Sequence, residues 1–165
     1  MKIFGIVGLK NSGKTYFVKK IISKLVSSKL KVASIKHAHH DFNIDKPNTD
    51  SYMHRLAGSE QVIISSSKRW AKISELNNSK EKNLTELIDE LDNPDIVVVE
   101  GYKNESHLKI EIIKDPTCTS GYLFKSLKNV IAIVSDTKIN AFNKKQFSKN
   151  QIDEIVNYML NYQDE

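Results

Sequence analysis

The sequence predicts an α/β fold in which the strands of a mostly parallel sheet alternate with helices. Two patterns support this prediction. Apolar runs of strand length alternate with segments whose apolar residues recur every three or four positions, and a glycine-containing turn joins the first strand to the first helix. In a chain of 165 residues, these patterns predict a single domain over residues 1–165 with right-handed crossovers between parallel strands.

Each element follows from one of the two patterns. Residues 2–8 form an apolar run that ends at a glycine, as expected for a buried parallel strand. The helix that begins at Lys14 has an apolar stripe that includes Phe17, Ile21 and Leu25. Further strands are predicted over residues 31–37, 61–65, 95–101, 108–113 and 130–135, and further helices over residues 51–56, 84–91 and 151–162. The strand over residues 95–101 is the most hydrophobic and is expected to be central in the sheet.

The composition is that of an ordinary folded protein, with 39% hydrophobic and 27% charged residues. The lone Cys118 cannot form an internal disulfide, and no apolar run approaches the roughly 20 residues of a membrane-spanning helix. Because no signal peptide is recognisable, we expect a cytoplasmic protein without a membrane partner. Only Arg55 and Arg69 among the 25 Lys and Arg residues are arginines, and the lysines are spread along the chain. This pattern argues against a nucleic-acid partner.

The turn after the first strand has the sequence GLKNSGKT over residues 8–15, which is the P-loop pattern Gly-x-x-x-x-Gly-Lys-Ser/Thr. Glycines allow the backbone N–H groups of such a loop to point toward phosphates. The lysine reaches the β- and γ-phosphates, and the threonine hydroxyl can ligate Mg²⁺. The sequence therefore predicts a nucleoside triphosphate site formed by Gly8, Asn11, Ser12, Gly13, Lys14 and Thr15.

A second residue for the metal is expected at the end of a neighbouring buried strand. Glu100 follows a run of valines and is predicted to hold Mg²⁺ with Thr15, directly or through water. The alternative is a strand-end carboxylate that faces solvent. Asp95 lies at the other end of the same strand, and we expect it to cap a turn far from the phosphates.

A polar segment over residues 38–58 begins where the second strand ends, at the rim where open α/β sheets bind ligands. Acidic residues beside a triphosphate can position Mg²⁺ or water. They favour the interpretation that this segment is a switch, which becomes ordered when the γ-phosphate is present. Two alternatives stay open. One is a solvated loop without a role. The other is a transition-metal site that uses His37, His39 and His40, although no second cluster with metal-ligand spacing accompanies them.

These motifs resemble those of the molybdopterin-guanine dinucleotide biosynthesis protein B family, the adapter-like GTP-binding proteins called MobB. The resemblance covers nearly the whole chain. Beyond the P-loop it rests on Lys36-His37 with His39-His40-Asp41, Asp45-Lys46-Pro47, Asp50-Ser51-Tyr52, Ala57-Gly58, Ser67 with Arg69-Trp70, and Glu100-Gly101-Tyr102-Lys103. The histidine and Asp-Lys-Pro block is far more specific than a P-loop, which thousands of proteins share.

The resemblance implies a doubly wound P-loop NTPase fold, a homodimer, GTP with Mg²⁺, and slow hydrolysis. It also implies that the protein helps a molybdopterin guanylyltransferase, with molybdopterin or its guanine dinucleotide form as a further partner. Two departures stand out: Asn48-Thr49 replace the usual Gly-Lys, and Tyr102 replaces Phe. The first bears on the backbone of the loop, because Asn is the next best residue to glycine at positive φ.

The remaining candidate residues concern chemistry and specificity. Asp41 and Asp45 are candidates for activating the attacking water, and Asp136, which follows the strand over residues 130–135, is the candidate for binding guanine. A turn cap is the alternative role of Asp136. Arg69 and Trp70 can either stack on a pterin ring or cover the edge of the core.

Two other functions stay open from the sequence. A P-loop small-molecule kinase is disfavoured because such enzymes close an arginine-rich lid over the phosphoryl group, and this chain has only two arginines. A nucleotide-binding module without turnover is the second.

Overall fold

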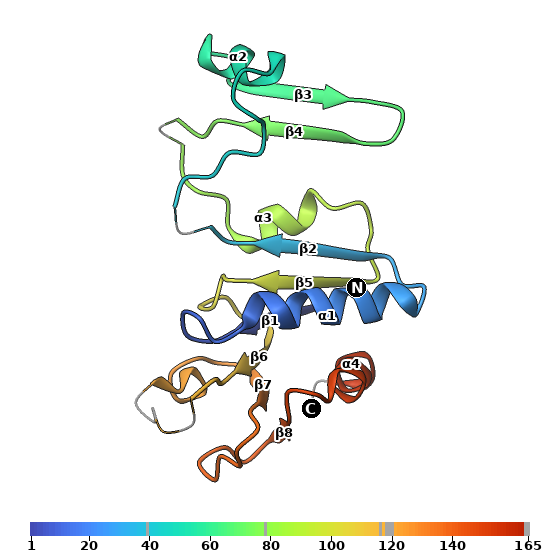
Figure 1. Cartoon of the computed structure of the whole chain (residues 1–165), viewed down its shortest axis with the longest axis vertical. Helices are drawn as coiled ribbons and strands as arrows, with labels where there is room; N and C mark the ends of the chain where they lie inside the picture. The colour runs from blue at the N-terminus through green and yellow to red at the C-terminus, as the bar shows by residue number, and fades with distance from the viewer. Residues whose placement is uncertain (39, 78, 116, 118–120, 164–165) are drawn as a thin grey trace. The chain divides into compact units, whose positions relative to one another are not determined.

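The computed structural model describes all residues except 39, 78, 116, 118–120 and 164–165, so the predictions on His39 and Cys118 lie outside the described residues (Figure 1). The chain divides into two compact units. The larger unit comprises Met1–His37 and Leu84–Glu165, and the smaller unit comprises Ala38–Asn83. No helix in the described part of the chain is long and apolar enough to cross a membrane.

The larger unit is built on a six-stranded sheet with the order β2-β5-β1-β6-β7-β8, in which every pair of neighbours is parallel. Its strands are β1 (Lys2–Val7), β2 (Val32–Lys36), β5 (Ile96–Glu100), β6 (Leu108–Ile112), β7 (Val130–Val134) and β8 (Lys145–Phe147). The valine-rich β5 pairs on both sides and is buried over residues 96–99. This arrangement confirms the predicted α/β fold with a mostly parallel sheet.

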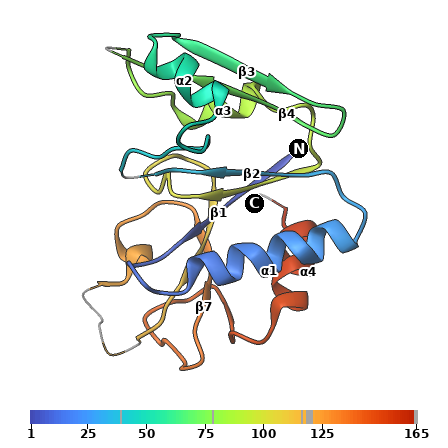
Figure 2. The same ribbon diagram turned by 45° about the horizontal axis from the view of Figure 1, so that its top comes forward.

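Helices cover both faces of this sheet. On one face, α1 (Lys14–Ser27) and α4 (Ile152–Asn161) lie side by side (Figure 2). They belong to one core cluster with strand residues such as Phe4 and Val98. On the other face, α3 (Leu84–Asp89) packs Leu84 against Val97 and Val99. Each such buried apolar side chain contributes about 2 kcal/mol, and successive residues of β5 contribute to opposite faces, with Val98 in one core cluster and Val97 and Val99 in another.

The smaller unit contains α2 (Asp50–Leu56) and an antiparallel pair formed by β3 (Gln61–Ser65) and β4 (Trp70–Ser74). β3 was predicted, but β4 was not, and the pair forms a separate sheet. The sequence between these strands lacks the Asn-Gly or Asp-Gly signal of a two-residue hairpin. Instead, the Ser66 hydroxyl donates to the carbonyl oxygen of Arg69 and closes the turn. The short β8 and the 3₁₀ helix η2 (Leu123–Lys125) were also not predicted.

Polar groups are buried in the larger unit near the start of β6. Neither ring nitrogen of His107 is exposed to water or has a hydrogen-bond partner within the described structure. Burial, and to a smaller extent the charge of Lys109, lower the pKa of His107 from 6.5 to about 4. Between pH 4 and pH 6.5, His107 binds a proton in the unfolded chain but not in the folded chain. The free energy of unfolding therefore rises with pH over this range.

We therefore expect the protein to lose stability as the pH falls from about 6.5 to about 4, by roughly 1–2 kcal/mol after allowance for solvent screening. Urea unfolding at several pH values in this range measures the effect. His107→Gln should flatten this part of the pH dependence, whereas the control His54→Gln, at an exposed position, should not. Identical pH profiles for wild type and His107→Gln would contradict the assignment.

Candidate functional site

The turn between β1 and α1 has the backbone conformation that a phosphate-binding loop needs. Asn11 and Gly13 have φ values of 62° and 92°. A Cβ atom at Gly8 would lie 2.5 Å from the carbonyl oxygen of Ile112 and 2.6 Å from Ser12 Oγ, so only glycine fits there. The loop thus depends on the close approach of its backbone to the end of β6.

The side chains of this loop leave hydrogen-bonding groups for a ligand. Lys14 Nζ donates to the carbonyl oxygens of Gly8 at 3.0 Å and Leu9 at 2.8 Å, so its ammonium group lies over the loop. The buried Ser12 hydroxyl has no partner in the described part of the chain. No side chain caps α1, and its first turn contains no acidic residue. The N-terminal N–H groups of α1, beginning after Gly13, are therefore suited to an anion.

Glu100 ends β5 next to the strand that leads into the loop. It pairs with Ile6 of β1 on one side and Lys36 of β2 on the other. Side chains alternate along a strand, and Val98 belongs to the core cluster that includes α1. Glu100 therefore lies on the face of the sheet that carries α1, and thus Thr15.

The chain turns sharply after Glu100. Gly101 and Tyr102 have φ values of 101° and 46°. His37 N–H donates to the carbonyl oxygen of Glu100 at 2.8 Å, and the His37 ring stacks on the Tyr102 ring with centroids 4.6 Å apart. Tyr102, which departs from the Phe of the resembled family, thus supplies an aromatic ring for this stacking. These contacts fix the backbone that carries the Glu100 carboxylate.

Of the three histidines considered as metal ligands, His37 is half-buried, His40 is exposed and His39 lies outside the described residues. No group of three or more His, Cys, Asp or Glu side chains among the described residues is placed to hold a metal ion.

Asp136 follows β7 at the same rim of the sheet as the loop. Its Oδ1 accepts the backbone N–H of Lys149 at 3.0 Å, and its Oδ2 lies 2.9 Å from Lys149 Nζ. These contacts lower the pKa of the Asp136 carboxyl. The sequence analysis proposed Asp136 as a candidate but gave no sign of its contact with Lys149, because 13 positions separate them and no local spacing joins the two loops.

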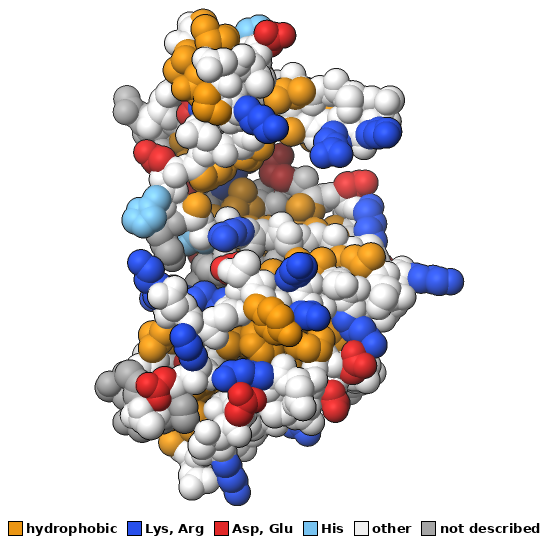
Figure 3. All heavy atoms as spheres, viewed as in Figure 1, with side chains coloured by type: hydrophobic (Ala, Val, Ile, Leu, Met, Phe, Trp, Pro, Cys, Tyr) orange, Lys and Arg blue, Asp and Glu red, His pale blue; other side chains and the backbone are white. Residues whose placement is uncertain are grey.

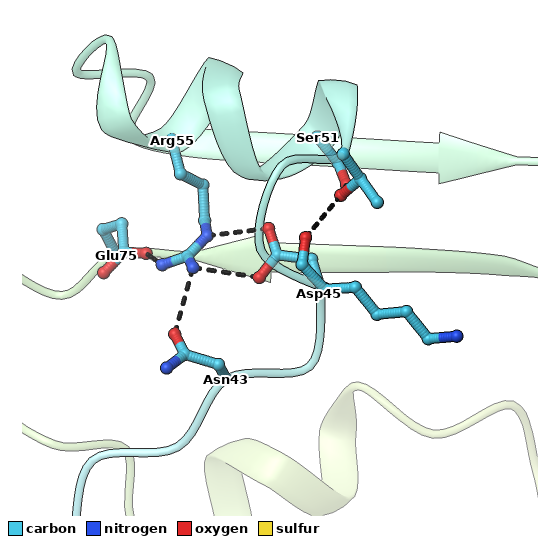
Figure 4. Close-up of polar contacts among 7 residues, drawn as sticks. Asn43, Asp45, Ser51, Arg55 and Glu75 are labelled. Carbon is cyan, nitrogen blue, oxygen red and sulfur yellow. Dashed lines mark hydrogen bonds and ion pairs between the residues drawn. The ribbon is translucent and has the colours of Figure 1, made fainter.

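In the smaller unit, Asp45 is bound by an arginine. Its side chain is 1% exposed and accepts two hydrogen bonds from Arg55, from Nε to Oδ2 at 3.0 Å and from Nη2 to Oδ1 at 2.9 Å (Figure 4). Arg55 also donates to Glu75 at 2.6 Å and to Asn43 at 3.1 Å, and the two carboxylates raise its pKa. Asp41 is exposed. Neither of the predicted water-activating residues lies in the same unit as the P-loop.

Asn48 and Trp70, which the sequence analysis singled out, both lie in the smaller unit. Asn48 has a φ of 66°, so the backbone at this departure from the family adopts the left-handed region that Asn tolerates. Trp70 is 69% exposed, so it does not cover the edge of the core of the smaller unit.

The comparisons with known proteins agree on one family. Residues 3–136 match the family described as molybdopterin guanine dinucleotide synthesis protein B. The chain is 37% identical over 134 residues to the molybdopterin-guanine dinucleotide biosynthesis adapter protein of Escherichia coli (strain K12), covering 78% of this chain and 75% of that one. It is 39% identical over 110 residues to the adapter protein of the same name from Haemophilus influenzae, of which it spans 61%.

Solved structures show the same fold. The MobB protein homolog from Bacillus stearothermophilus superposes with a TM-score of 0.74 at 20% identity, covering 98% of this chain and 97% of that one. The structure of Bacillus subtilis MobB gives a TM-score of 0.76 at 23% identity, covering 97% and 96%.

Proposed function

This chain belongs to the molybdopterin guanine dinucleotide synthesis protein B family, and on that premise we propose that it is a GTP-binding adapter in the biosynthesis of molybdopterin guanine dinucleotide. It assists a guanylyltransferase rather than transferring the nucleotide itself, and it hydrolyses GTP slowly. The observation that supports nucleotide binding most strongly is the loop over residues 8–15, with its close backbone approach and its uncapped helix.

The proposed ligand is GTP with Mg²⁺. The phosphates would lie against the backbone of Gly8, Asn11, Ser12 and Gly13, with Lys14 turning from its carbonyl partners toward them. Thr15 and Glu100 would hold the metal, whose chemistry is to neutralise the developing charge on the phosphate oxygens. Asp136 would accept hydrogen bonds from guanine.

The small number of arginines, and the contacts that one of them makes, favour slow GTP hydrolysis over kinase activity. The guanidinium of Arg55 is engaged by Asp45, Glu75 and Asn43 within the smaller unit. This leaves Arg69 as the other arginine of the chain, too few for an arginine-rich lid over a transferring phosphoryl group. Asp45, with both carboxylate oxygens bound to Arg55, is poorly suited to activate water.

The metal assignment gives a direct test. Thr15→Ala and Glu100→Gln should each reduce the enhancement of GTP affinity by Mg²⁺ about tenfold, because each removes an oxygen ligand or its charge. Affinity is measured by calorimetry at several Mg²⁺ concentrations. Glu154→Gln, at an exposed position of α4, serves as the control and should behave as wild type. Unchanged Mg²⁺ dependence in both site variants would exclude this metal site.

We also propose that the protein is a homodimer, because the smaller unit leaves apolar surface uncovered. Among the described residues of this unit, Val62 is the only buried large apolar one. Figure 3 shows apolar side chains gathered over α2, where Met53 and Leu56 are 52% and 65% exposed. The two-stranded sheet exposes Ile63 and Trp70 on one face, and isolated hairpins are marginal in water. We propose that a second copy of the chain covers this apolar surface and pairs with a free edge of the two-stranded sheet.

Sedimentation of a double variant tests the dimer. Ile63→Lys with Trp70→Lys places charge on the face that a partner would bury, so we expect wild type to sediment as a dimer and the variant as a monomer. Val26→Lys, at a 54% exposed apolar residue on α1, should leave the dimer intact. A monomeric wild type, or a variant that stays dimeric, would refute this interface.

A further inference from the structure

Two loops at the carboxyl rim of the larger unit meet through one pair of residues. β7 and β8 are parallel neighbours, with Val134 opposite Phe147, so the residues that follow them leave the sheet at the same edge. Asp136 follows β7, and Lys149 follows β8. As described above, Lys149 holds one carboxylate oxygen with its backbone N–H and the other with its ammonium group. One residue therefore fixes the orientation of the whole carboxylate.

This pair is not needed to hold the loops together. Its two side chains are 37% and 57% exposed, and ion pairs with such exposure contribute little to stability. Gln146 already ties the loop after β7, because its amide donates to the carbonyl oxygen of Thr137 at 2.8 Å and its Oε1 accepts the N–H of Ile139 at 3.1 Å. Gln146 therefore holds the loop after β7 independently of the ion pair between Asp136 and Lys149.

Lys149 also lines an open depression of about 550 Å³ beside the P-loop, whereas Asp136 lines a separate depression, so the Asp136 and Lys149 pair borders both. Asn11, Gly13 and Tyr16 line the depression beside the P-loop, and Tyr16 is 56% exposed. A depression of this size holds a small planar ligand, and a tyrosine offers an aromatic face for stacking. A nucleoside whose phosphates lie on the P-loop would extend into this space.

We propose that Lys149 is the positioning residue that orients the Asp136 carboxylate to read guanine, an inference that rests on the proposed GTP site. A carboxylate has about four acceptor sites, two on each oxygen. Lys149 occupies one on each oxygen, which leaves one on each for the adjacent N1–H and 2-amino hydrogens of guanine. The contact with Lys149 also favours the ionised carboxylate, which is the form that accepts both hydrogen bonds.

The test compares GTP with inosine triphosphate, which lacks the 2-amino group. For wild type we expect GTP to bind about tenfold more tightly, since a hydrogen bond to a charged acceptor is lost. In Lys149→Met the backbone N–H still holds Oδ1, but Oδ2 loses the ammonium group that holds it, so the carboxylate can turn and the ratio of GTP to inosine triphosphate affinity should fall below about threefold. Asp136→Asn should instead shift preference toward xanthosine triphosphate, because the amide can donate to the 2-oxo group.

Lys144→Met serves as a matched control, because Lys144 is an exposed lysine that precedes β8 and should keep the wild-type ratio. Circular dichroism verifies that each variant is folded. An unchanged ratio in Lys149→Met, or equal losses for GTP, inosine triphosphate and ATP, would overturn the orienting role. Failure of wild type to bind any nucleotide would instead refute the proposed function on which it rests.

Discussion

Replacing Lys14 with alanine is expected to weaken GTP binding at least about a hundredfold while the fold survives. The ammonium group makes charge-assisted hydrogen bonds to phosphate oxygens, which are roughly twice as strong as neutral ones. Within the described part of the chain it donates to the carbonyl oxygens of Gly8 and Leu9 and lies at a half-exposed position, so its removal takes away little buried apolar area. Calorimetry with GTP measures the binding loss, and thermal unfolding checks the fold.

The matched control for this experiment is Lys19→Ala. Lys19 is an exposed lysine on the same helix, so this change removes the same charge from α1 away from the loop. It should leave GTP affinity within about twofold of wild type. If Lys14→Ala binds GTP as wild type does, the P-loop does not hold the phosphates.

Replacing Arg55 with alanine is expected to unfold the smaller unit locally. Asp45 would stay buried without its partner, and breaking a buried ion pair in this way is strongly destabilising. The unit has little apolar core to compensate, so amide hydrogen exchange over residues 38–83 should accelerate about a hundredfold. Exchange within β1, β5 and β6 should not change.

A double-mutant cycle separates the loss of the ion pair between Arg55 and Asp45 from other effects of removing the Arg55 side chain. Arg55→Ala with Asp45→Ala removes both charges, so it should exchange more slowly than Arg55→Ala alone. Arg55→Lys keeps a charge but loses the two-pronged geometry, so it should recover only part of the protection. Wild-type exchange in Arg55→Ala would contradict a stabilising role of the pair.

The parts of the fold that sequence reasoning captured depend on local signals. The P-loop is one continuous stretch, the strand before it is a short apolar run, and the helix after it has a clear periodicity of 3.6 residues. The buried run of β5 likewise indicates an internal strand without any knowledge of its neighbours. For these elements, the residues that decide the structure are adjacent in sequence.

The parts that were missed depend on contacts between distant residues. Asp45 and Arg55 lie ten positions apart, on a loop and a helix, and their pairing has no signature in sequence spacing. β4 pairs with β3 outside the main sheet, and its own sequence carries no strong strand signal. The sequence patterns made Asp45 a candidate for activating water, but they gave no sign of its burial or of its two hydrogen bonds from Arg55.

A calorimetric titration of the whole chain with GTP and with ATP in the presence of Mg²⁺ tests whether this protein binds a guanine nucleotide. We expect saturable binding of GTP at one site per chain, with ATP bound at least about tenfold more weakly because adenine lacks the N1–H and 2-amino donors that Asp136 is proposed to accept. Equal affinity for both nucleotides would contradict guanine recognition. The absence of saturable binding of either would contradict the nucleotide site itself.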